Sequence, residues 1–112
     1  MRTFKNSAAQ GDVYFRRVDA MPAGVVEVAP ENGVLIVTHS ETGHNHIMDG
    51  TKVKMYSLPD SIMDCFLVVN DPTAVEHLRS YDTHEPIFFE RGIYHARRQR
   101  EYIPEGFRRV AD

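Results

Sequence analysis

The stretch VVEVAPENGVLIVTH, residues 25–39, decides the fold class, because two short apolar segments flank a turn signal. Residues 25–29 and 34–39 are rich in valine and isoleucine, which favour strands. Between them lies Asn32-Gly33, a dipeptide that tolerates a positive φ at both positions and is typical of two-residue hairpin turns. We therefore expect two antiparallel strands joined by this turn. The nearly continuous apolar run at 34–39 favours a central strand that is buried on both faces.

The same alternation of short apolar segments and turn signals continues along the chain. Further strands are expected at 12–18, 51–58, 62–69, 86–90 and 92–102. Residues 70–81 differ, because Asp71 can cap a helix and Pro72 suits its first position. About seven or eight strands with one helix are typical of small antiparallel β domains. The expected fold class is all-β (β-rich), a small antiparallel sandwich or barrel with one short helix.

The chain length of 112 residues favours one domain. We expect a single β-rich domain over 1–112 with residues 1–10 loosely ordered. Cys65 is the only cysteine and lies in the apolar run IMDCFLVV, so it is expected to be a buried small apolar residue. The first residues lack the apolar stretch of a signal peptide, and no run approaches the roughly 20 apolar residues of a membrane helix. These features favour the bacterial cytoplasm, or association with a virion, and no membrane partner.

Histidines are concentrated in HSETGHNH, residues 39–46. An H-x-H pair on an extended segment places two imidazoles on one side, and neutral imidazole is the commonest side-chain ligand of transition metals. The candidate metal ligands are His39, His44, His46, His84 and His95, with Asp49 as a further donor. Zn, Fe or Mn would suit such a set. The alternative is a polar loop in which Ser40, Glu41, Thr42 and Asn45 satisfy the turn backbone.

Two fragments resemble the motifs of the cupin superfamily, namely His44-x-His46 and Gly92-x-x-His95-x-x-x-Gln99. This resemblance implies a cupin-like barrel in which the two motifs meet at a metal. In cupins, three or four residues separate H-x-H from a glutamate. That glutamate is missing here, and only two residues separate Asp49 from His46.

A second resemblance extends over nearly the whole chain. QGDVYFRRVDAMPAG, HSETGHNHIM, HEPIFFERGIYHARRQREYIPEG and the terminal RRVAD resemble a family of small proteins of bacteriophages and mobile elements. Its signatures are Thr-Gly-His-x-His and Gln-Arg-Glu-Tyr, here at 42–46 and 99–102. The resemblance implies a phage or prophage setting with no assigned activity. It also favours a cluster of His44, His46 and His84 over one that needs His95.

Charge is unevenly distributed along the chain. Residues 1–90 contain 7 Lys and Arg against 13 Asp and Glu, whereas residues 91–112 contain 6 arginines against 3 acids. Such a basic segment with interleaved aromatics can hold an anion or single-stranded nucleic acid. The candidate residues are Arg97, Arg98, Arg100 and Tyr102. The alternative is an edge strand whose charges prevent aggregation.

No phosphate-binding glycine loop, G-x-S-x-G, H-E-x-x-H or C-x-x-C motif occurs, so the sequence leans away from an enzyme without excluding one. We expect a non-catalytic phage or mobile-element accessory protein that binds a protein partner or associates with itself. Two alternatives remain open. One is a metal-binding cupin-like protein or metal-dependent enzyme, and the other is weak nucleic-acid binding through the arginine-rich C-terminal strand.

Overall fold

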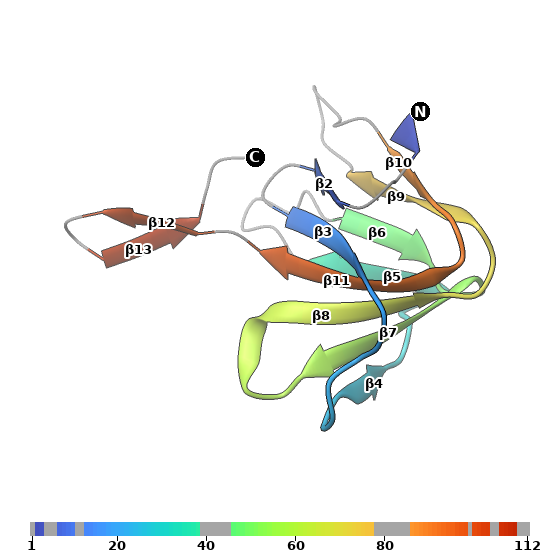
Figure 1. The fold of residues 1–112 in the computed structure, drawn as a ribbon, viewed down its shortest axis with the longest axis horizontal. Helices are drawn as coiled ribbons and strands as arrows, with labels where there is room; N and C mark the ends of the chain where they lie inside the picture. The colour runs from blue at the N-terminus through green and yellow to red at the C-terminus, as the bar shows by residue number, and fades with distance from the viewer. Residues whose placement is uncertain are drawn as a thin grey trace.

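The computed structural model describes the backbone of residues 2–3, 7–10, 13–38, 46–77, 86–98, 100–103 and 106–109. These residues are built into β-strands joined by turns and bends (Figure 1). The strands are β1 (Arg2–Thr3), β2 (Ser7–Gln10), β3 (Val13–Val18), β4 (Val26–Val28), β5 (Val34–Thr38), β6 (His46–Asp49), β7 (Val53–Leu58), β8 (Ser61–Val69), β9 (Thr73–His77), β10 (Ile87–Phe89), β11 (Gly92–Arg98), β12 (Arg100–Ile103) and β13 (Gly106–Arg109). The described ranges contain no helix, so the all-β class is confirmed. In that part of the chain, no helix is long and apolar enough to cross a membrane.

The strands form two main sheets and a separate hairpin. Sheet I has six strands in the order β2-β3-β11-β8-β7-β4. Sheet II has five strands in the order β1-β10-β9-β6-β5, in which β1 and β10 are parallel and the other neighbours antiparallel. β12 and β13 pair with each other and form the C-terminal hairpin. Sheets I and II pack as the expected antiparallel sandwich, with the C-terminal hairpin extending away from both (Figure 1).

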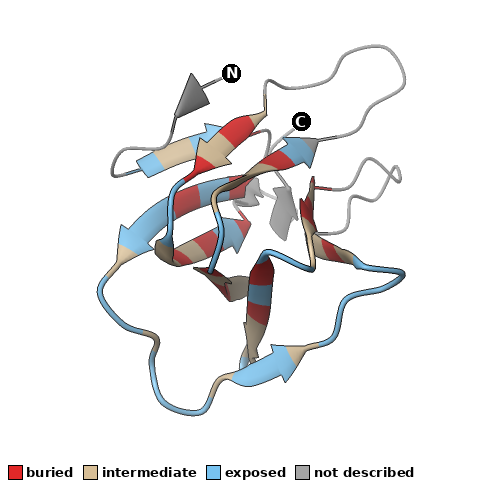
Figure 2. Cartoon of the chain, turned by 90° about the vertical axis from the view of Figure 1, so that its right-hand side faces the viewer, coloured by how far each residue is buried: buried red, intermediate tan, exposed pale blue. Residues whose placement is uncertain are grey.

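The core lies between the inner faces of the two sheets. Alternation along each strand decides which residues enter it: in β3, Val13 and Phe15 are buried and Tyr14 is exposed. Figure 2 shows this alternation as bands along the ribbons. Phe89 of sheet II meets two aromatic rings of sheet I, with ring centroids 5.2 Å from Phe15 and 4.7 Å from Tyr94. These contacts join the sheets at their centre.

The Asn32-Gly33 turn is confirmed, but the hairpin expected around it is not. Asn32 and Gly33 have φ angles of 52° and 79°, and Glu31 and Val34 exchange both backbone hydrogen bonds. Beyond that bridge the strands separate, because β4 pairs with β7 in sheet I and β5 pairs with β6 in sheet II. β5 consequently lies at an edge of sheet II, and the expectation of a central strand is wrong.

The helix expected at 70–81 is also wrong over the residues that the structure describes. The N–H groups of Asn70 and Asp71 donate to the Lys52 carbonyl, and β9 follows as a strand. β9 lies between β10 and β6, and its backbone pairs with both of these strands. This pairing outweighs the local capping signal, and residues 78–81 lie outside the described ranges. Residues 2–3 and 7–10 form the strands β1 and β2.

Truncating Phe89 to alanine is expected to lower the free energy of unfolding by about 3–5 kcal/mol, because it leaves a cavity between the sheets. Its neighbour Phe88 points to the outer face of sheet II and is only partly buried. Phe88→Ala is therefore the matched control, with an expected loss of about 1–2 kcal/mol. Urea unfolding followed by far-UV circular dichroism measures both. Equal losses would show that the sheet-to-sheet aromatic contact has no special weight.

Candidate functional site

The outer face of sheet I carries aromatic, cationic and acidic side chains next to one another. Directly paired residues of neighbouring antiparallel strands lie on the same face of a sheet. The register therefore creates one row across the whole sheet, made of Ser7, Arg16, His95, Phe66, Tyr56 and Glu27. The row beside it contains Ala9, Tyr14, Arg97 and Asp64.

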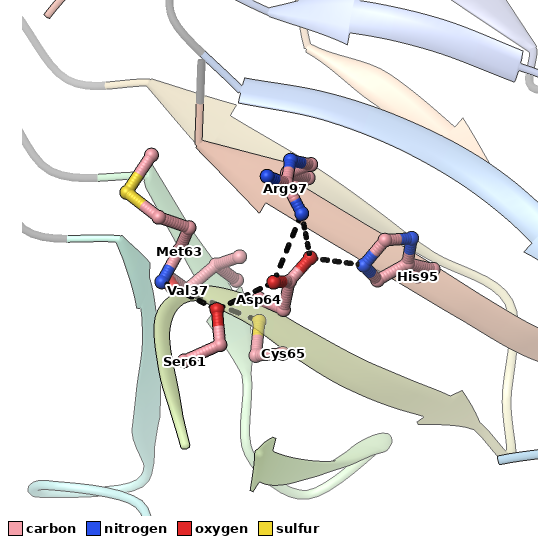
Figure 3. A network of polar contacts seen from close by, with 7 residues as sticks. All are labelled: Val37, Ser61, Met63, Asp64, Cys65, His95 and Arg97. Atoms are coloured by element: carbon pink, nitrogen blue, oxygen red, sulfur yellow. Dashed lines mark hydrogen bonds and ion pairs between the residues drawn. The ribbon is translucent and has the colours of Figure 1, made fainter. Parts of the chain in front are cut away.

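The Asp64 carboxylate is the centre of a polar network on this face (Figure 3). His95 Nε2 donates to its Oδ1 at 2.6 Å, and Ser61 Oγ donates to its Oδ2 at 2.5 Å. Arg97 Nη1 lies 3.0 Å from Oδ1 and 3.1 Å from Oδ2. Three different side chains from β8 and β11 therefore hold one carboxylate whose own side chain is only 8% exposed.

These partners keep Asp64 ionised despite its burial. Burial acts to raise the pKa of the carboxyl group, because it penalises the charged form. The hydrogen bonds from Ser61 and His95 and the positive charge of Arg97 outweigh that effect, so the pKa of Asp64 lies below its ordinary value. Asp64 is therefore a carboxylate at neutral pH.

The geometry of the network does not match a nucleophilic relay. In such a relay, the hydroxyl bonds to the imidazole, and the carboxylate supports the other side of the ring. Here Ser61 and His95 both donate to the same carboxylate. Asp64 therefore ties two strands together, and its oxygens are occupied by donors of the protein itself.

Cys65 is directed to the opposite side of β8, where it packs partly buried against the core (Figure 3). Its thiol donates a weak hydrogen bond to the Val37 carbonyl, with Sγ and O 3.9 Å apart. Burial raises the pKa of the Cys65 thiol to about 12, and the negative charge of Asp64 adds to this effect. The expectation of a small apolar role for Cys65 agrees with this placement, and the thiol lacks the activation of a nucleophile.

Exposed residues surround the network on the same face. The His95 ring stacks on Phe66, with centroids 4.9 Å apart and an interplanar angle of 21°. Tyr14 is 37% exposed, the Arg97 side chain is 57% exposed, and Ile62 is 83% exposed at the start of β8. A rigid centre of packed and ion-paired groups is thus bordered by accessible tyrosine, arginine and isoleucine side chains.

Of the histidines proposed as ligands, His46 lies fully buried between the sheets. Its Nδ1 donates to Oε1 of the Gln10 amide at 2.9 Å, and Gln10 Nε2 donates to the Val75 carbonyl at 3.2 Å. Gln10 belongs to sheet I, whereas His46 and Val75 belong to sheet II. His46 therefore takes part in a buried polar bridge between the two sheets.

The structure does not bring His46 and His95 together, because His95 is on the outer face of sheet I. His39, His44 and His84 lie outside the described residues. Among the residues that are described, no group of three or more His, Cys, Asp or Glu side chains could hold a metal ion.

The proposed anion-binding residues are divided between two faces. Arg97 is on the outer face and pairs with Asp64, whereas Arg98 is 8% exposed and follows the inward-facing Tyr94 and Ala96 by alternation. Arg100 and Tyr102 belong to β12, and their side chains lie outside the description. Of the two candidate residues in β11, only Arg97 is directed to the outer surface of the sandwich.

The sequence reasoning missed Asp64, Phe66, Tyr14 and Arg16 as members of one surface. A signal was present in IMDCFLVV, where Asp64 is a single carboxylate inside an apolar strand. A charge in that position needs a partner. Its partners His95 and Arg97 lie about thirty residues away and are identified only by the pairing of β8 with β11.

Of three comparisons with known proteins, the one with protein families gives a match. A family model described as a domain of unknown function (DUF8820) matches residues 9–99. The comparisons with curated proteins and with solved structures found no match. The matched range includes the Asp64 network and ends before the C-terminal hairpin begins.

Asp64→Asn is expected to destabilise the protein at neutral pH, by about 1–3 kcal/mol, because it weakens three hydrogen-bonded contacts. The lowered pKa of Asp64 stabilises the fold in full above its ordinary value of 3.8, and this contribution is lost as pH falls through the folded-state pKa. The stability difference between wild type and variant should therefore shrink at acidic pH. Urea unfolding at pH 7 and pH 3 measures it. Asp60→Asn, at an exposed turn residue, is the control; a constant difference at both pH values would contradict the ionised network.

The raised pKa of Cys65 predicts slow alkylation. At pH 8 the thiolate fraction of the folded protein should be roughly a thousandfold below that of an ordinary thiol. Iodoacetamide labelling followed by mass spectrometry compares the native chain with the chain in urea, where labelling should become fast. Similar rates in both states would contradict burial of the thiol.

Proposed function

The chain belongs to the DUF8820 family, and from this starting point we propose that it is a non-catalytic binding protein whose outer face of sheet I contacts a protein partner or a second copy. The observation that carries the proposal is the arrangement of this face, in which Tyr14, Arg16 and Ile62 border the packed Asp64–His95–Phe66 centre. Tyrosine and arginine are the residue types that most often dominate binding energy at protein interfaces.

Preorganisation supports a binding role for this surface. Side chains held by hydrogen bonds and stacking lose little further freedom when a partner docks. His95 is held between Asp64 and Phe66, and Arg97 is held by both oxygens of the same carboxylate. The chemistry of the site supports the same conclusion, because its carboxylate is saturated and the pKa of the neighbouring Cys65 thiol is about 12.

Charge favours a protein over a nucleic acid as the occupant of this face. Arg97 is neutralised by Asp64, and Glu27 is at the β4 end of the same row. A surface that neutralises phosphates needs a clear excess of cations. The exposed Ile62 instead adds an apolar anchor, which suits a protein interface.

The setting that we propose is that of a phage or mobile-element accessory protein in the bacterial cytoplasm or on a virion. This part rests on the resemblance of the sequence to small proteins of bacteriophages and mobile elements.

Site-specific photo-crosslinking tests the proposal whatever the identity of the partner. A benzophenone amino acid at position 14 or 62 should yield one discrete adduct in cells of the bacterium that carries the gene. The same probe at Lys52, an exposed turn residue outside this face, is the control. An adduct of twice the chain mass identifies self-association, and another mass identifies a partner.

Arg16→Glu should reduce the yield of that adduct about fivefold or more, because it reverses an exposed charge beside the probe. Arg16 is chosen over Arg97 because Arg97 also supports the Asp64 network. Absence of an adduct, or equal labelling from all three probe positions, would exclude this face as the binding surface.

A further inference from the structure

The row of paired residues across the outer face of sheet I carries opposite charges on either side of its centre. From β3 to β4 its members are Arg16, His95, Phe66, Tyr56 and Glu27. Arg16 and Glu27 are both exposed. The strands that carry this row follow the order β3-β11-β8-β7-β4, so β8 lies two strands from either charge (Figure 1).

These two charges are too far apart to pair within one chain. Four strand spacings of about 4.8 Å separate β3 from β4, which places Arg16 roughly 19 Å from Glu27. Among the described residues, the ion pairs on this face are those of Asp64, and neither Arg16 nor Glu27 takes part in them. Within that part of the chain, both charges are available to another molecule.

A two-fold axis along β8 makes this row complementary to itself. Rotation about such an axis turns a second copy face to face with the first and exchanges the two sides of β8. β3 of each copy then lies over β4 of the other, which places Arg16 opposite Glu27 twice in one interface. Phe66 meets Phe66 of the second copy at the centre. An axis across the strands would oppose Arg16 to Arg16 and Glu27 to Glu27, so charge selects the axis along β8.

We propose that the chain forms a symmetric dimer through the outer face of sheet I, with reciprocal ion pairs between Arg16 of each copy and Glu27 of the other. This inference rests on the proposed function, because it uses the same face, and it names a second copy as the occupant.

Apolar residues beside the row supply contact area for this dimer. Val18, Ile93 and Val68 are paired directly with one another on the same face, and each is only partly buried. Covering them with a second sheet removes apolar surface from water. Sheets that pack face to face lie about 10 Å apart, a gap that an arginine and a glutamate span together from opposite sides.

The other charges of the face are compatible with this arrangement. Asp64 lies on β8 close to the axis, but its side chain is only 8% exposed and is paired with Arg97 of the same chain. Lys54 of β7 is exposed and comes to lie over Ile93 of the second copy. The stem of a lysine can cover apolar surface in this way while its ammonium group stays in water.

The size of the face indicates how strongly the copies associate. Six strands are about 24 Å wide and a six-residue strand is about 20 Å long, so two copies bury roughly 1,000 Å² together. This area is at the lower end of specific protein interfaces. We therefore expect a dimer that dissociates in the micromolar range.

Sedimentation velocity of the full-length protein, at concentrations up to about 1 mM, tests the dimer. Wild-type protein should pass from monomer to dimer and associate no further, because a two-fold contact closes on itself. Arg16→Glu and Glu27→Arg should each raise the dissociation constant about tenfold or more, since each places two pairs of like charges in contact.

The double variant Arg16→Glu/Glu27→Arg distinguishes direct pairing from a general effect of charge. It restores opposite charges at both contacts of a symmetric dimer, so its dissociation constant should lie within about threefold of the wild-type value. An equimolar mixture of the two single variants should also associate, because every altered charge then meets an opposite one. A double variant that stays as weak as the single variants overturns the proposed arrangement.

Lys52→Glu and Glu76→Arg are the matched controls, because they make the same charge reversals at exposed positions outside this face. Both should associate as wild type does, and circular dichroism checks that every variant is folded. A wild type that remains monomeric overturns the dimer, as does association that Arg16→Glu and Glu27→Arg leave unchanged.

Photo-crosslinking from position 14 or 62 separates failure of the dimer from failure of the proposed function. If wild type is monomeric and the probe yields an adduct of another mass, the face binds a different protein; the dimer is then overturned and the proposed function stands. If neither association nor an adduct is found, both are overturned.

Discussion

The contact of Phe89 with Phe15 and Tyr94 is the interaction on which the two-sheet arrangement depends. Phe89 is buried completely in sheet II, and its two partners are buried completely in sheet I. Because these rings point into the core, alternation directs the residues before and after each ring along its strand outward. Tyr14 is therefore directed outward because Phe15 is directed inward. The composition of the outer face of each sheet is therefore a consequence of how the core is packed.

Three polar groups inside this frame, Gln10, His46 and Asp64, are tolerated because each has hydrogen-bond partners. Gln10 connects His46 and the Val75 carbonyl between the sheets, and Asp64 collects donors from Ser61, His95 and Arg97. Buried polar groups that are satisfied in this way restrict the strands to one register. The two arrangements also use residues that resemble catalytic or metal-binding groups when they are viewed along the sequence alone. In the fold they hold strands together.

The two sheets offer outer faces of different chemistry. Sheet I presents tyrosine, arginine and isoleucine around an ion-paired centre, which suits a protein partner. Sheet II presents an apolar groove with two carboxylates, Asp49 and Glu76. These two faces lie on opposite sides of the core. The family domain includes both faces, and the hairpin extends beyond it.

The sequence by itself determined the all-β class, most strand positions and the Asn32-Gly33 turn, since alternation and turn chemistry are local properties. It also indicated the buried character of Cys65. It could not show that β4 and β5 separate into different sheets, or that β9 is a strand, because both depend on partners distant along the chain. The Asp64 network has the same origin: Asp64 and His95 meet only through the β8–β11 register. Tertiary structure alone decided which polar residues stabilise the fold and which remain on the surface, because strand pairing brings together residues that no local pattern connects.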